Sequence, residues 1–245
     1  MLRRWLARAW LGWVLFYGAL TVLGVYLPYR LIVWLWKPPR RYHMGLRLSK
    51  WWAKAVLWGA GIRLKITRPA VIPSSGSYLW VANHRHELDI PIAAVASPQP
   101  FRFLAKAELQ KIPLLGFIIA SMYILVDRGD RRSRFQAFLE MRKTLESGFS
   151  VLVFPEGRRN RSRTPLLPFE PGAFRLAIDA QAPVVLMVIR DLPKRLVRSG
   201  EKVIGFLPGA VEVVIEPVPL SQHVSESVLS NYCFQRMSAI IEGMG

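Results

Sequence analysis

Cysteine is nearly absent from this sequence of 245 residues, where Cys233 is the single example. No internal disulfide can form, so the fold does not need an oxidising compartment to mature. Internal repeats and low-complexity tracts are also missing, and a chain of this length then accommodates one ordinary domain with a short appendage. Apolar residues make up 52% of the chain and charged residues 20%, a composition that excludes a disordered protein.

Acidic residues are absent before Glu87. Of the 34 basic residues, 14 precede Glu87, and the formal net charge of the whole chain is +18. Tryptophan is absent after Trp80, so all nine tryptophans lie in the first third of the chain. Tryptophan prefers the headgroup level of a bilayer, and Lys and Arg are attracted to anionic lipids. The first third therefore predicts a region that docks on an anionic membrane.

Charge is missing again from Ala9 to Leu27, a run of 19 almost wholly apolar residues. As a helix this run is about 28 Å long, roughly the thickness of a hydrocarbon core. Pro28 is expected to end or bend the helix, and basic residues flank both sides, so charge does not fix the topology. Residues 1–42 are predicted to form a membrane anchor, either one span or a bent helical hairpin within one leaflet. A signal peptide is disfavoured because no small-residue cleavage site precedes Pro28.

The following segment, residues 43–62, has the pattern of an amphipathic helix. Its cations Arg47, Lys50 and Lys54 recur on one face, while apolar residues cover much of the rest. Such a helix can lie in the membrane interface with its cations toward lipid phosphates. The alternative is an amphipathic helix that packs on the domain.

Residues 63–245 alternate short apolar runs with helical patterns, which predicts an α/β domain with a mixed, largely parallel central sheet flanked by helices. The continuous apolar runs Leu152–Phe154 and Val184–Ile189 indicate strands that are buried on both faces. Strands are expected at 64–67, 78–82, 102–105, 123–126, 151–154, 184–189 and 211–215. Helices are expected at 88–95, 114–121, 131–147, 172–180 and 225–242.

Residues suited to catalysis follow the predicted strand that ends at Ala82. His84 and Asp89 are five positions apart across a strand-to-helix turn, so the carboxylate can accept one imidazole N–H and leave the other nitrogen as a base. The carboxyl ends of strands are also where α/β sheets carry their sites. A metal site from His84, His86 and Glu87 is disfavoured because no distant Cys or His cluster completes it.

A second candidate follows the predicted strand that ends at Phe154. Glu156 and Gly157 come first, and the glycine lets the backbone approach a ligand. Arg158 and Arg159 follow at once, and their forked donors fit phosphate oxygens. The alternative is a solvated basic loop, but a carboxylate beside so many arginines indicates an organised polar site. Charges also stand at the ends of two other predicted strands, namely Lys106 and Arg128.

These groups, in this order, resemble the HxxxxD glycerolipid acyltransferase family, most closely the bacterial 1-acylglycerol-3-phosphate acyltransferases. The resemblance covers about residues 61–219, and four motifs in register make it specific. The matching blocks are Asn83-His84…Asp89, Lys106-Ala107-Glu108-Leu109…Pro113…Gly116…Asp127-Arg128, Phe154-Pro155-Glu156-Gly157-Arg158-Arg159 and Ala182-Pro183-Val184-Val185.

The resemblance implies a role for each matching residue. His84 is similar to the general base that takes the proton from the sn-2 hydroxyl of lysophosphatidate, and Asp89 to the acid that orients it. Lys106 and Arg159 match the positions that hold the acceptor phosphate. No metal and no cofactor is implied, and acyl-CoA or acyl-carrier protein is the acyl donor. The supporting positions are Asn83, Gly116, Arg128, Glu156, Gly157 and Arg158.

The resemblance implies a membrane-bound enzyme of phospholipid synthesis that makes phosphatidic acid at the cytoplasmic face of a bacterial inner membrane. Three departures concern the part that reads the headgroup: Arg158 replaces the usual Thr, Glu170 stands near a usual Lys, and Leu186-Met187 follow where the fourth motif usually continues with proline. Another lysophospholipid or a lyso-ornithine lipid is therefore an alternative acceptor. A non-catalytic protein that binds membranes or nucleic acid is a distant alternative, because no nucleic-acid-binding motif accompanies the charge.

Overall fold

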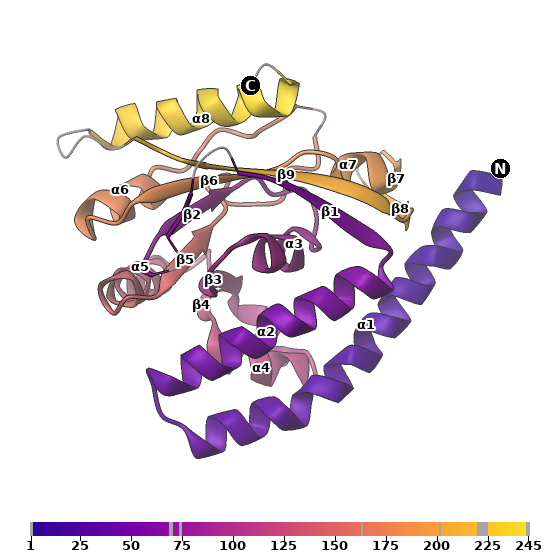
Figure 1. The fold of residues 1–245 in the computed structure, drawn as a ribbon, viewed down its shortest axis with the longest axis horizontal. Helices are drawn as coiled ribbons and strands as arrows, with labels where there is room; N and C mark the ends of the chain where they lie inside the picture. The colour runs from indigo at the N-terminus through magenta and orange to yellow at the C-terminus, as the bar shows by residue number, and fades with distance from the viewer. Residues whose placement is uncertain are drawn as a thin grey trace.

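A helical hairpin leads into an α/β body in the computed structural model, which describes residues 2–68, 71–73, 75–162, 164–200, 202–219 and 225–243 (Figure 1). The hairpin consists of α1 (Leu2–Leu35) and α2 (Arg40–Gly59). The two helices run side by side and join the body where α2 leads into the first strand.

The body is built on a seven-stranded sheet with the order β1-β9-β6-β2-β5-β3-β4. All neighbouring strands are parallel except β6 and β9, which are antiparallel. This is the predicted α/β fold, and each predicted strand is present with bounds that differ by at most two residues. The strands are β1 (Ile62–Thr67), β2 (Leu79–Ala82), β3 (Phe101–Lys106), β4 (Ile124–Val126), β5 (Ser150–Val153), β6 (Val184–Ile189) and β9 (Gly209–Pro217).

Helices cover both faces of the sheet (Figure 1). In β2, Trp80 packs into the core on the side of α2 and α3, while Leu79 and Val81 pack into the core on the side of α5, α6 and α8. All three side chains are fully buried, which explains why the central strands read as continuous apolar runs. The helices of the body are α3 (Asp89–Ala96), α4 (Leu115–Met122), α5 (Arg131–Glu146), α6 (Gly172–Asp179) and α8 (Glu226–Glu242).

The hairpin packs on the body through one side of α1. Near its start, Trp10 Nε1 donates to the carbonyl of Ala60 at 3.1 Å. Near its end, the hydroxyls of Tyr29 and Ser49 lie 2.6 Å apart in the interior, and Tyr123 donates to the same Ser49 oxygen at 2.7 Å. The opposite side of α1 is apolar and exposed along its length: Leu15, Phe16, Leu20, Leu23 and Leu27.

Among the described residues, α1 is the one helix that is long and apolar enough to cross a membrane, and none of its most apolar stretch is buried within the protein. Pro28 was expected to end or bend this helix, and it does not end it, because α1 continues to Leu35. Proline removes one helical N–H, and the neighbouring Tyr29 joins this turn to α2 through Ser49, which also accepts from Tyr123 of the body.

The amphipathic segment begins earlier than expected, because α2 starts at Arg40, inside the segment assigned to the anchor. It buries Leu46, Ala53 and Leu57 against the body and exposes Trp51 and Trp58. The helix therefore packs on the domain through one face and presents tryptophans on another. Of its three predicted interfacial cations, Lys50 donates instead to the carbonyls of Ser97 and Pro98 at the end of α3.

Four short elements were not predicted. They are the 3₁₀ helix η1 (Ala107–Lys111), α7 (Leu192–Arg195), and the antiparallel pair β7 (Leu196–Ser199) and β8 (Lys202–Phe206). The β7–β8 pair supports the start of α1, where Gly205 lies so close to Ala7 that an added Cβ would come within 2.6 Å of the alanine Cβ.

Candidate active site

Five strands of the sheet run parallel to one another, and the residues singled out from the sequence lie at the carboxyl ends of four of them. Asn83 and His84 follow β2, Lys106 ends β3, Arg128 follows β4 and Glu156 follows β5. Because parallel strands bring their carboxyl ends to the same edge, residues far apart in sequence meet there.

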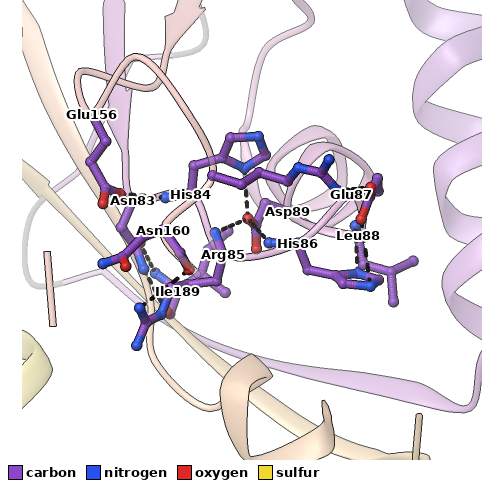
Figure 2. A network of polar contacts seen from close by, with 11 residues as sticks. Asn83, His84, Arg85, His86, Glu87, Leu88, Asp89, Glu156, Asn160 and Ile189 are labelled. Atoms are coloured by element: carbon purple, nitrogen blue, oxygen red, sulfur yellow. Dashed lines mark hydrogen bonds and ion pairs between the residues drawn. The ribbon is translucent and has the colours of Figure 1, made fainter. Parts of the chain in front are cut away.

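His84 and Asp89 lie side by side, with His84 Nδ1 2.8 Å from Asp89 Oδ2 (Figure 2). The same carboxylate oxygen accepts from the backbone N–H of Arg85 at 2.6 Å and of His86 at 2.8 Å. Asp89 is fully buried, and the Phe154 ring stacks on the imidazole with the ring centres 4.0 Å apart. Asp89 is an acceptor from three donors, so His84 donates through Nδ1 and its Nε2 is available as a base.

The backbone of His84 is held by the loop that follows β5. Glu156 Oε1 accepts from the His84 N–H at 2.8 Å, and Glu156 Oε2 accepts from the Leu167 N–H at 2.9 Å. The His84 carbonyl in turn accepts from the Asn160 N–H at 2.7 Å. Glu156 is almost completely buried, and burial raises its pKa while the two N–H donors oppose the shift. Glu156 therefore joins the loop after β2 to the loop after β5.

Two more side chains fix these loops to the sheet and to each other. Asn83 makes both of its amide hydrogen bonds to the backbone of Ile189 at the end of β6, at 2.8 and 2.9 Å. Arg85 donates to the carbonyls of Ser162 and Thr164, at 3.1 and 3.0 Å. The residues on either side of His84 are thus hydrogen-bonded to the end of β6 and to the loop after β5.

The imidazole opens into a pocket of about 590 Å³. Glu87 is the one acidic residue among the described residues that line it, whereas five are basic. One wall is apolar, and such a wall suits the hydrocarbon next to a lipid headgroup. The basic residues are Lys106, Arg128, Arg158, Arg159 and Arg161, and the apolar ones include Ile90, Phe103, Leu104, Leu109 and Leu167.

The glycine after Glu156 has a backbone conformation that requires glycine. Gly157 has φ +66°, and an added Cβ would lie 3.1 Å from Glu170 Cγ. Its carbonyl accepts a hydrogen bond from the Arg128 guanidinium, so the end of β4 holds the turn after β5. Arg158 is exposed on this turn, while Lys106 pairs with Glu108 at 2.8 Å.

Arg159 forms an ion pair with Glu87, a residue of the loop between His84 and Asp89. Burial and the nearby Arg161 lower the pKa of Arg159, but a guanidinium remains charged at neutral pH. The pair therefore joins a cation of the third motif to the loop that carries the base.

A family model described as acyltransferase matches residues 63–190, about half of the chain. The chain belongs to the acyltransferase family. It is 31% identical over 175 residues to an uncharacterized acyltransferase of Schizosaccharomyces pombe, which covers 68% of this chain and 60% of the yeast protein. It is 26% identical over 181 residues to the 1-acyl-sn-glycerol-3-phosphate acyltransferase of Escherichia coli, which covers 71% of this chain and 70% of that protein.

The fold of this acyltransferase is also that of a solved structure. The crystal structure of PlsC, the 1-acyl-sn-glycerophosphate acyltransferase of Thermotoga maritima, is similar with a TM-score of 0.79 and 24% identity. The match covers 99% of this chain and 96% of the Thermotoga chain. The hairpin of α1 and α2 is thus part of the shared architecture.

The acyltransferase brings nearly all of the residues predicted from the sequence to one place. The His84–Asp89 pair and the cations Lys106, Arg128, Arg158 and Arg159 lie in or at the pocket. Asn83, Glu156 and Gly157 form hydrogen bonds that hold the loops carrying these residues. Gly116 does not line the pocket. It lies at the start of α4, where a Cβ would come within 2.1 Å of the Gln110 carbonyl oxygen, so it shapes the turn after η1.

Sequence reasoning assigned no role in the site to four residues of these stretches. The Arg85 side chain donates to backbone carbonyls, the Asn160 N–H donates to the His84 carbonyl, and Glu87 and Arg161 line the pocket. For Arg161 a signal was present, because it continues the run of arginines after Gly157. The described residues contain no group of three or more His, Cys, Asp or Glu arranged to hold a metal ion.

Proposed function

We propose that this acyltransferase moves a fatty acyl group from acyl-CoA or acyl-carrier protein to the sn-2 hydroxyl of 1-acylglycerol-3-phosphate. The observation that carries the proposal is the His84–Asp89 contact of 2.8 Å at the rim of a pocket with five cations. A base next to a phosphate-binding surface fits an alcohol that carries a phosphate close to its reacting hydroxyl. The activity named for the E. coli relative supports the same assignment.

In this proposal His84 Nε2 takes the proton from the acceptor hydroxyl. The oxygen attacks the thioester carbonyl carbon, the carbon–sulfur bond breaks, and the thiolate leaves. The proton held on the imidazole then passes to the sulfur, so that the products are the ester and a free thiol. Asp89 keeps the imidazole in the correct tautomer and stabilises its charged form. The scheme assigns no metal and no cofactor, and the acyl donor is a substrate.

The headgroup is assigned to the cations of the pocket. Lys106 and Arg159 come from the ends of different strands, so they can approach one phosphate from two sides. General-base catalysis contributes about 10²- to 10⁴-fold, and positioning of the two substrates supplies the rest. The apolar wall with Phe103 and Leu109 would receive the start of the acyl chain.

A different acceptor, another lysophospholipid or a lyso-ornithine lipid, is favoured by one observation. Glu170 lies next to Gly157, on the turn that carries Arg158 and Arg159, and its carboxylate can attract a headgroup that carries an ammonium. Such an acceptor would use the same base and the same donor.

We also assign the hairpin to the membrane, at the cytoplasmic face of a bacterial inner membrane. Both ends of α1 contact the body, through Ala7 against Gly205 and through Tyr26 on Phe117 of α4. The helix therefore lies along the protein with one apolar face exposed, an arrangement that supports insertion into one leaflet over a separate span. The surrounding cations would bind anionic lipids.

The test is an acceptor panel with one labelled acyl-CoA and one labelled acyl-carrier protein, read as free thiol and labelled product. Lysophosphatidate is expected to be the best acceptor among lysophosphatidate, lysophosphatidylethanolamine, lysophosphatidylglycerol and lyso-ornithine lipid. His84→Ala should abolish turnover, while the matched His43→Ala, in α2 against Phe149, should retain it. Full turnover by the His84 variant would overturn the assignment of the base, and a preference for lyso-ornithine lipid would establish the alternative acceptor.

A further inference from the structure

Glu87 is the one carboxylate among the described residues that line the pocket, and the proposed mechanism gives it no role. Glu87 lies between the base and its orienting acid in sequence, lines the pocket, and has a side chain that is 64% exposed. Its Oε1 is paired with the guanidinium of Arg159, whose side chain is 35% exposed. Exposed ion pairs contribute little to the stability of a fold, so this contact is not needed to hold the loop together.

Arg159 is the charged partner of Glu87 among the described residues. The other neighbouring group is His86, with Nε2 3.5 Å from Glu87 Oε2. His86 Nδ1 accepts from the Leu88 N–H at 3.2 Å, and burial lowers the pKa of His86 to about 4. His86 is therefore neutral at pH 7, so that the charge of Glu87 is balanced by the guanidinium.

A carboxylate and a phosphate present the same kind of oxygen atoms to a guanidinium. Arg159 is the residue that the proposed function assigns to the acceptor phosphate. The two anions thus require the same donors of one side chain. They cannot both use these donors fully, and a phosphate that enters must displace Glu87 or share Arg159 with it.

We propose that Glu87 occupies the place of the acceptor phosphate in the empty enzyme and releases Arg159 when the acceptor binds. The inference rests on the proposed function, in which Arg159 holds that phosphate. Glu87 is then a specificity-determining residue. It opposes every anionic headgroup through competition and like-charge repulsion, and it offers a partner to a headgroup with an ammonium group near its phosphate.

The experiment compares Glu87→Gln with Glu146→Gln, a matched variant. Glu146 pairs with Arg142 at 2.7 Å on α5, and both side chains are about half exposed. Glu146→Gln therefore removes the same charge from the same kind of ion pair, away from the pocket. The probe is glycerol 3-phosphate, titrated by calorimetry into the detergent-solubilised full chain without an acyl donor. Binding to Glu87→Gln is expected to be on the order of tenfold tighter than to the wild type. Glu146→Gln should bind as the wild type does.

A double-mutant cycle with Arg159→Gln isolates the contact. Arg159→Gln should weaken binding of the probe, and Glu87→Gln should then have little additional effect, since the competition no longer exists. A purely structural role of Glu87 would not depend on Arg159 in this way. The KM for lysophosphatidate in Glu87→Gln should fall by a factor similar to that for the probe, and more than the KM for lysophosphatidylethanolamine.

The outcomes separate the two proposals. Should Arg159→Gln leave probe binding unchanged, the assigned role of Arg159 in the proposed function is wrong. Should Arg159→Gln weaken binding while Glu87→Gln binds the probe equally or more weakly than the wild type, Glu87 orients Arg159 or does nothing, and the inference is overturned. An equal fall in the KM for lysophosphatidate and for lysophosphatidylethanolamine would support the competition for Arg159 and would overturn the effect of Glu87 on headgroup specificity.

Discussion

The pocket loops and the helical hairpin are both rich in cations, but they are held in place by different forces. At the pocket, four buried polar side chains form hydrogen bonds to backbone groups: Asn83, Asp89, Glu156 and Asn160. In the hairpin, close apolar approach is combined with a few hydrogen bonds from tryptophan and tyrosine side chains, as at Gly59, where an added Cβ would come within 2.1 Å of the Tyr17 ring and whose carbonyl accepts from Trp13. The difference fits the task that we propose for each region.

Proton transfer requires a base that is fixed to within a fraction of an ångström, whereas docking on a lipid surface requires a broad apolar face. Buried hydrogen bonds to the backbone have defined lengths and directions, so they suit the first task. Apolar packing has no direction and tolerates small displacements. We therefore expect mutations at the pocket to affect rate steeply, and mutations in the hairpin to affect stability and location.

The largest effect should come from Asp89→Asn. The amide can place its nitrogen toward His84 Nδ1 and favour the wrong tautomer, and it carries no charge to stabilise the imidazolium. We expect turnover to fall by about 10³-fold, with secondary structure and membrane recovery unchanged. The measurement is thiol release under saturating substrates. Loss of less than about threefold would show that Asp89 does not orient the base, and would weaken the contrast between the two regions.

The second largest effect concerns the pH dependence of stability. The folded-state pKa of His86 is lowered, mainly by burial, to about 4 from an ordinary 6.5. Between these values the unfolded chain binds a proton that the folded chain does not, so stability rises with pH across this window. The contribution is complete above pH 6.5 and amounts to about 3 kcal/mol, which is lost as the pH falls to 4.

The variant His86→Asn tests this contribution. Asparagine keeps an acceptor for the Leu88 N–H and does not titrate. Denaturant unfolding in detergent between pH 4 and 7 should show a shallower decline for the variant than for the wild type. Identical slopes would mean that His86 titrates normally in the folded protein.

Much of this architecture could be predicted because it depends on local patterns. Alternating apolar runs located the strands, and the five-residue spacing of His84 and Asp89 placed them across one turn. What the sequence did not show are contacts between loops. The pairing of Glu87 with Arg159 joins residues 72 positions apart, and the clamp of Arg85 on the carbonyl of Thr164 joins residues 79 positions apart. No local rule specifies such contacts.

The hairpin shows the opposite case, in which a local rule is overridden by packing. Pro28 predicts the end or a bend of a helix, yet α1 continues to Leu35 because Tyr29 and Ile32 are buried against α2 and α4. The short β7–β8 pair was missed because its strands are only four and five residues long and partly charged. Elements of this size depend on their neighbours, here the start of α1.

A smaller effect is expected from removing one cation of the pocket. Lys106→Gln should raise the KM for lysophosphatidate by about tenfold, because a charge-assisted contact to the phosphate is lost. The KM for the acyl donor should stay within twofold, and Lys111→Gln, at the end of the 3₁₀ helix that follows Lys106, serves as the control. An equal rise in both KM values would assign Lys106 to the donor or to the shape of the pocket instead.

The smallest effect should come from the polar contact that fastens the hairpin. The Ser49 hydroxyl forms hydrogen bonds with the hydroxyls of Tyr29 and Tyr123, and it donates to the Gly45 carbonyl at 3.1 Å. In Ser49→Ala the two tyrosines lose their shared partner, so the free energy of unfolding should fall by about 1–2 kcal/mol. Tyr29 retains the Gly45 carbonyl as an acceptor at 3.2 Å, which limits the loss. Turnover at 25 °C should be unchanged, because no atom of this contact reaches His84. A large fall in turnover without a loss of stability would show that the hairpin positions the catalytic loops, and that the two regions are not independent.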